Sequence, residues 1–143
     1  MAFRKKKSQQ NDDVAVKARE LADGFVIGAA RDGYQFDYTP ASAGRLNTYA
    51  DDFVASGPPD EVKHSVIIAM GTFLGELIVR NGVGRWQRTE SNELTVFLER
   101  TGQDGYTAYP LNKVAKRIGG DKQQDIKYFY DVCVRGGPIP DNL

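Results

Sequence analysis

The chain has 143 residues, of which 41% are hydrophobic and 27% are charged, the proportions of one soluble globular domain. Its 19 basic and 19 acidic residues balance to a formal net charge of zero, which argues against a domain that binds nucleic acid over its whole surface, because such domains are usually strongly basic. The single cysteine excludes a disulfide within the chain and fits a reducing compartment.

Residues 1–11 are polar and include a block of basic residues at 4–7. They predict a disordered, solubilising tail, with contact to an acidic lipid or a nucleic acid as the alternative. The segment has no apolar run of the kind that a secretory signal needs, and position 2 is not the glycine that myristoylation requires. We therefore expect a cytoplasmic protein with one folded domain over 12–135 and a C-terminal tail over 136–143.

Two helices are predicted before the centre of the chain. The first, which Asp12 or Asp13 can cap, ends at about residue 31, and the second runs over 40–55. Between them, aromatic and polar residues alternate over 34–38. This alternation predicts a short extended piece, either an edge strand of a sheet or an aromatic linker.

The stretch from Pro59 to Trp86 organises the prediction. Pro59 suits the first position of a helix, and two acidic residues follow it in the first turn, where they face the positive end of the helix dipole. Apolar residues cover more than one face of the segment 60–81, which predicts a largely buried helix. Charged residues interrupt the run and leave it short of the ~20 apolar residues of a membrane span, so we expect no span.

Gly71 and Gly75 share one face of this central helix. A glycine inside a helix costs ~1 kcal/mol relative to alanine, so both positions indicate close packing. A neighbouring helix of the same domain is one interpretation, and the seam of a homodimer is the other.

After Trp86 the apolar period changes from helical to two. Strands are predicted at 84–88, 94–99 and 106–109, the last after a turn at 102–105. Two closing helices follow, one from Pro110 and one capped by Asp121, which places Cys133 in the core. Three antiparallel strands with one apolar face need a cover. The sequence therefore predicts an α+β fold: a long central helix packed on a three-stranded antiparallel sheet, with two N-terminal and two C-terminal helices.

The sequence predicts no catalytic residue, cofactor or metal with any specificity. Its single histidine, His64, forms with Glu61 only a fragment of a metal-ligand pattern. The glycines at 82 and 84 follow a helix, whereas a phosphate-binding loop opens one.

Two candidate sites follow from the charged residues. The leading function is a non-catalytic interaction domain for an unknown partner protein, or for a second copy of the chain, with nucleic acid disfavoured. An acidic partner or a phosphate-bearing ligand would meet a basic patch beside Tyr106 and Tyr109; a solvated face is the plain alternative. The patch consists of Arg85, Arg88, Lys113, Lys116 and Arg117.

The alternative function is a small ligand-binding or hydrolase-like enzyme centred on Glu76, Arg80 and Trp86. Glu76 and Arg80 have the spacing of an ordinary helix ion pair, yet a carboxylate among apolar residues can have a raised pKa and act as an acid or base. Glu76 in an open pocket without a cation would favour the enzyme. Glu76 paired with Arg80 would disfavour it.

Three pieces of the sequence carry a resemblance. They are Asp37–Ser42 at a helix start, Leu74–Arg80 followed by Gly84-Arg85-Trp86, and Pro110–Val114 with Arg117. Together they resemble a family of small, uncharacterised bacterial proteins of actinomycete type, whose central motif is Leu-Gly-Glu, three residues, Arg, and then Gly, one residue and Trp. The resemblance implies a compact α+β domain, and it implies no established activity.

Overall fold

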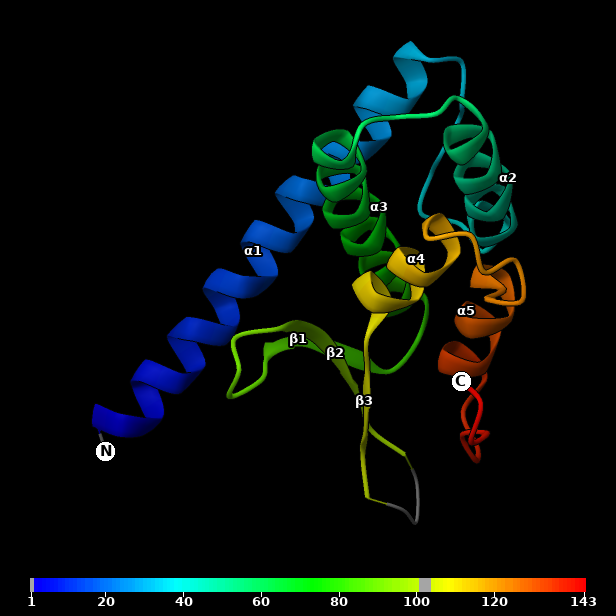
Figure 1. The fold of residues 1–143 in the computed structure, drawn as a ribbon. Helices are drawn as coiled ribbons and strands as arrows, with labels where there is room; N and C mark the ends of the chain where they lie inside the picture. Colours follow the sequence, from blue (N-terminus) through cyan, green and yellow to red (C-terminus); the bar gives the residue numbers. More distant parts are fainter. Residues whose placement is uncertain (1, 101–103) are drawn as a thin grey trace.

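The computed structural model describes the backbone of residues 2–100 and 104–143, and side chains from residue 13 onward within those ranges. In these ranges the predicted α+β fold is confirmed: five helices accompany one three-stranded antiparallel sheet, and the long α3 contacts α1, α4 and β1. The elements are α1 (Ala2–Arg31), α2 (Ala41–Ala55), α3 (Asp60–Asn81), β1 (Gly84–Arg88), β2 (Leu94–Leu98), β3 (Tyr106–Ala108), α4 (Pro110–Ile118) and α5 (Ile126–Arg135) (Figure 1).

Helix α1 is continuous and longer than predicted, so the expected cap at Asp12 or Asp13 is wrong. No glycine or proline precedes residue 24, and the lysines, arginine and glutamines of 1–11 are good helix formers. The backbone is therefore helical where the sequence predicted a tail, and α1 crosses α3 and continues beyond it (Figure 1). The predicted end is confirmed by Gly33, whose φ of 90° is costly for other residues.

The segment between α1 and α2 is an aromatic linker, because the sheet of the described residues consists of β1, β2 and β3. Phe36 is buried, with its ring 5.1 Å from that of Phe25 and 5.5 Å from that of Phe73. The Asp37 carboxylate accepts hydrogen bonds from the main-chain N–H and the hydroxyl of Thr39. These bonds favour a turn over an extended strand.

Helix α3 is buried along its second half. Every residue from Met70 to Ile78 is buried, whereas Val62 is 43% exposed and 66–69 are half-buried. By length and composition alone α3 could cross a membrane, contrary to the predicted shortfall of apolar residues. The core helix of a soluble protein passes the same test, and half of the apolar window of α3 is buried against the rest of the chain.

Strands β1 and β2 form the predicted hairpin, with Trp86 opposite Val96. Strand β3 pairs antiparallel with the other edge of β2, and Trp86, Val96 and Leu98 are buried. Asn92, between β1 and β2, has a φ of 67°, a left-handed conformation that asparagine tolerates in turns. Residues 101–103 lie outside the described part of the chain, and with them the first two residues of the turn predicted at 102–105.

The two closing helices follow the prediction with one change. Pro110 occupies the first position of α4, where its missing N–H leaves no hydrogen bond unmade. Asp125 caps α5 by accepting a hydrogen bond from a main-chain N–H of its first turn, so the predicted cap at Asp121 is wrong. Asp121 instead accepts from the N–H of Gln123 in a separate turn. Cys133 is buried, and burial raises its pKa to about 12, as suits an inert core thiol.

Candidate binding surface

The two glycines of α3 let other parts of the chain approach closely. A Cβ atom on Gly71 would lie 2.6 Å from the Cα of Leu111 on α4, and one on Gly75 would lie 2.1 Å from the Trp86 indole on β1. The space beside each glycine is thus filled by another part of the same chain. The interpretation as a homodimer seam is therefore wrong, and close packing inside the domain is confirmed, by a helix at Gly71 and by a strand at Gly75.

Glu76, the centre of the alternative site, is 3% exposed. Its Oε1 lies 3.8 Å from Arg80 Nε, while its Oε2 and Trp86 Nε1 are buried without a hydrogen-bond partner. Burial raises the pKa of Glu76, and the charge of Arg80 opposes this rise. Among the residues that the structure describes, Glu76 is absent from the linings of four surface hollows.

Arg80 connects Glu76 to the aromatic linker. Its guanidinium lies 3.5 Å from the centre of the Tyr38 ring, a cation–π contact, and the Tyr38 hydroxyl donates to Asp23 on α1 at 2.5 Å. These contacts join α1, the aromatic linker and α3. The structure thus brings Glu76, Arg80 and Trp86 together, but as a packing junction in which the carboxylate is enclosed.

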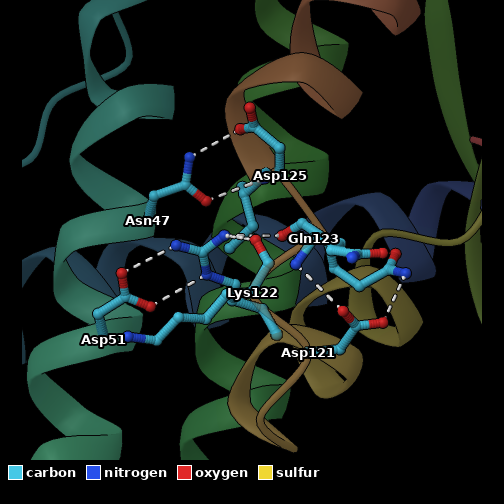
Figure 2. A network of polar contacts seen from close by, with 9 residues as sticks. Asn47, Asp51, Asp121, Lys122, Gln123 and Asp125 are labelled. Atoms are coloured by element: carbon cyan, nitrogen blue, oxygen red, sulfur yellow. Dashed lines mark hydrogen bonds and ion pairs between the residues drawn. The ribbon is translucent and has the colours of Figure 1, made fainter.

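Arg117, a predicted binding residue, ties α4 to α2. Its Nε and Nη2 donate to the two carboxylate oxygens of Asp51 at 3.0 and 2.8 Å, and its Nη1 donates to main-chain oxygens between α4 and α5. Figure 2 shows Asp51 beside Asn47, which bonds both to Asp125 and to the first N–H of α5. Because Arg117 makes all these hydrogen bonds within the chain, it stabilises the fold and is a poor candidate for binding a partner.

Arg85 and Arg88 lie toward opposite ends of β1. Arg85 pairs with Glu99 and lies 4.7 Å from the centre of the Phe97 ring. Arg88 donates to the main-chain oxygen of Asn92 and borders a hollow that reaches the start of α4. The five predicted residues therefore do not form one patch.

Lys113 and Lys116 differ in exposure although they are three residues apart on α4. Lys116 is exposed. Lys113 is 6% exposed, and its Nζ donates to Gln124 Oε1 at 2.9 Å and to the main-chain oxygen of Leu143 at 3.1 Å. Burial lowers the pKa of Lys113, and the charge of Lys116 lowers it further. Both line a hollow of about 140 Å³, the lysine pocket, together with Tyr106, Tyr109, Asn112, Phe129 and Leu143.

A larger hollow of about 360 Å³, the α4 groove, lies between α1, α3, the β1–β2 turn and α4. Tyr109 and Asn112 line both hollows and form a ridge between them. Tyr109 is 40% exposed, so this ridge is open to a partner. The apolar residues of the groove are Leu21, Ile68, Leu94 and Leu111.

Comparisons with protein-family models, curated proteins and solved structures found no match. The resemblance to a family of small bacterial proteins therefore stays a prediction. Among the described residues there is no group of three or more histidines, cysteines and carboxylates that could hold a metal ion.

Sequence reasoning placed Lys113, Lys116, Tyr106 and Tyr109 near one another but missed the α4 groove. The spacing of Lys113 and Lys116 on one predicted helix was the signal that placed the lysines together. The apolar residues of the groove come from four separate elements, so no local pattern could have indicated it.

Proposed function

We propose that the chain is a non-catalytic binding domain that recognises an acidic segment of a partner protein. The contact surface is the ridge of Tyr109 and Asn112, with the α4 groove on one side and the lysine pocket on the other. The observation that carries this proposal is the pairing of two hollows. One is lined by apolar residues, and the other is lined by two lysines and, among the described residues, by no aspartate or glutamate side chain.

The chemistry of the two hollows defines the partner. The groove, with its apolar floor, favours an aliphatic or aromatic side chain. The lysine pocket favours a carboxylate, because an ammonium and a carboxylate form a charge-assisted hydrogen bond. Tyr109 between them has the rigid, amphipathic side chain that is enriched in protein interfaces. A segment with an apolar residue close to an aspartate or glutamate fits both hollows.

The enzyme alternative receives less support. A general acid or base has to come within hydrogen-bond distance of its substrate, and Glu76 is enclosed beside Arg80 and Trp86. The ion pairs of Arg85 and Arg117 also leave fewer free cations for nucleic acid. We include a cytoplasmic location in the proposal, on the basis of the single, buried cysteine.

A photo-crosslinking amino acid at position 109 tests this surface. Tyr128 supplies a matched control, because it is also 40% exposed but lines neither hollow. In the cells from which the chain comes, we expect an adduct from position 109 and none from 128, with the crosslinked partner peptide rich in aspartate and glutamate. Lys116→Glu should abolish the adduct by charge repulsion.

Equal adducts at both positions, no adduct at either, or an adduct that survives Lys116→Glu would contradict the proposal. An adduct of twice the mass of the chain would also contradict it, because the occupant would then be a second copy.

A further inference from the structure

We infer that a hollow between the end of α1 and the end of α2, the aromatic hollow, binds a quaternary ammonium group between tyrosine rings and carboxylates. The hollow has a volume of about 200 Å³, and it shares no lining residue with the α4 groove or the lysine pocket. This inference therefore goes beyond the proposed function and does not depend on it. The lining residues are Asp32, Tyr34, Tyr49, Asp52, Phe53 and Ser56.

Two local features of the chain bring these residues together. At the end of α1, the N–H of Tyr34 donates to the main-chain oxygen of Ala29 at 2.9 Å, and Gly33 has a φ of 90°. This arrangement ends many helices and reverses the chain, so Tyr34 returns toward α2. The lining residues over 49–56 lie three, four and seven positions apart and therefore share one face of α2. Both helices end on the same side of the molecule (Figure 1).

Aromatic rings form the walls of the hollow. The rings of Tyr34 and Tyr49 have centres 5.0 Å apart and an angle of 79° between their planes, so they meet as a corner. Both side chains are half-buried, which leaves part of each one open to the hollow. The face of an aromatic ring attracts a cation through its quadrupole, and cages of such rings recognise quaternary ammonium ligands.

The charge of the hollow is negative. Its lining includes the carboxylates of Asp32 and Asp52 and, among the described residues, no lysine or arginine side chain. None of the ion pairs in the described part of the chain includes either carboxylate. The Tyr34 hydroxyl donates to Asp52 at 2.6 Å. This hydrogen bond, then burial and the charges of Asp52 and Asp32, raise the pKa of Tyr34. Both negative charges therefore act at the Tyr34 ring, where a cation would lie.

The same walls disfavour other cations. A calcium ion takes about six to eight oxygen ligands, and two carboxylates among aromatic rings supply too few. A primary ammonium is compact and strongly hydrated, so its transfer to these walls costs more than that of an alkylated ammonium, whose methyl groups contact the rings. The volume of about 200 Å³ is several times the ~30 Å³ that one water molecule occupies in the liquid. A trimethylammonium group therefore fits.

NMR titration of the ¹⁵N-labelled full chain tests the inference. The probes are choline chloride and a peptide with one trimethyllysine. The matched control ligand is 3,3-dimethyl-1-butanol, which has the shape of choline without its charge. We expect a saturable shift of the amides of 32–34 and 49–53, and binding of the neutral alcohol about tenfold weaker than that of choline. Saturation by choline indicates a free small molecule as the ligand, and saturation by the peptide alone indicates a modified side chain of a partner.

Variants of the lining separate the contributions of ring and charge. Tyr34→Leu keeps an apolar side chain but removes the aromatic face, and it should weaken binding about fivefold, whereas Tyr34→Phe keeps the face and should bind within about twofold of the parent. Asp32→Asn should weaken binding about threefold through the loss of one charge. Glu90→Gln is the matched control and should leave the affinity unchanged, because Glu90 is exposed and does not line the hollow.

The dispersion of the amide signals verifies the fold of each variant. Should Tyr34→Leu not fold, Asp32→Asn serves in its place, because Asp32 is exposed. Shifts that grow linearly with both probes, as with sodium chloride at equal ionic strength, would overturn the inference. Equal binding of choline and the neutral alcohol, or equal affinities of Asp32→Asn and Glu90→Gln, would also overturn it. The crosslink at position 109 remains a separate test of the partner surface, since that residue does not line the aromatic hollow.

Discussion

Glu76 lies in the buried half of α3, with Oε1 3.8 Å from Arg80 Nε and no hydrogen-bond partner for Oε2. Burial raises its pKa above the value of the unfolded chain, so between the two values the folded protein binds more protons than the unfolded one. Its contribution to stability is therefore lost as pH rises through the folded-state pKa. A buried, incompletely paired carboxylate of this kind destabilises the folded state.

The variant Glu76→Gln should accordingly be more stable than the parent at pH 7, by about 1 kcal/mol, because it removes the buried charge and keeps the shape of the side chain. Arg80 is not stranded by the change, since its side chain is 37% exposed and stays on the Tyr38 ring. Thermal melts between pH 4 and 8 measure this, and the gain should vanish toward pH 4. Glu99→Gln, at an exposed ion pair, should change little. A loss of stability in Glu76→Gln at pH 7 would contradict the argument.

At the scale of elements, the contact of α3 with β1 depends on the absence of a side chain at Gly75. The Trp86 indole occupies the space that a Cβ atom would need. Protein cores are close-packed and tolerate added atoms poorly. Packing between a helix and a strand thus accounts for the glycine at 75 and the tryptophan at 86 in the central motif.

Gly75→Ala should destabilise the protein by about 2 kcal/mol, because the indole has to move from its place in the core. Gly24→Ala on α1 is the control: a Cβ atom there meets nothing within 4 Å, so the variant should gain up to about 1 kcal/mol from helix propensity. Urea denaturation of both variants measures the two effects. Equal changes in the two variants would show that propensity, and not packing against Trp86, controls position 75.

At the scale of the whole molecule, one side-chain network joins α2 to α4 and to the start of α5. Arg117 on α4 and Asp51 on α2 are 66 residues apart in sequence, and Asn47 extends the same contacts to the start of α5 (Figure 2). The Arg117 side chain is 11% exposed and that of Asp51 38%. The pair is thus partly shielded from water, which strengthens it relative to a surface pair.

A double-mutant cycle with Asp51→Asn and Arg117→Gln should give a coupling energy of about 2 kcal/mol. The bidentate hydrogen bond with Arg117 holds the pKa of Asp51 below its ordinary value, so this stability is lost as pH falls through the folded-state pKa. The exposed pair Lys127–Asp131 is the control and should give a much smaller coupling energy, because solvent screens it. Chemical denaturation measures both cycles, and equal coupling energies would refute the role of burial.

The boundaries of several helices and strands could be predicted from residues that are close together in the chain. Pro59 and Pro110 mark the starts of α3 and α4, and the change of apolar period after Trp86 separates helix from sheet. These signals act between residues close in the chain, and so they can be read without coordinates. The same local rules misjudged Asp12 and Asp13, where good helix formers continue α1 through a possible cap.

The exposure of each charged side chain depends on contacts between distant parts of the chain and could not be predicted from local patterns. Lys113 and Lys116 look alike in the sequence, yet one is buried against Gln124 and Leu143 while the other is exposed. Arg117 is likewise taken by Asp51. The partner of a long side chain belongs to the distant element that packs beside it. The periodicity of one helix does not indicate which element that is.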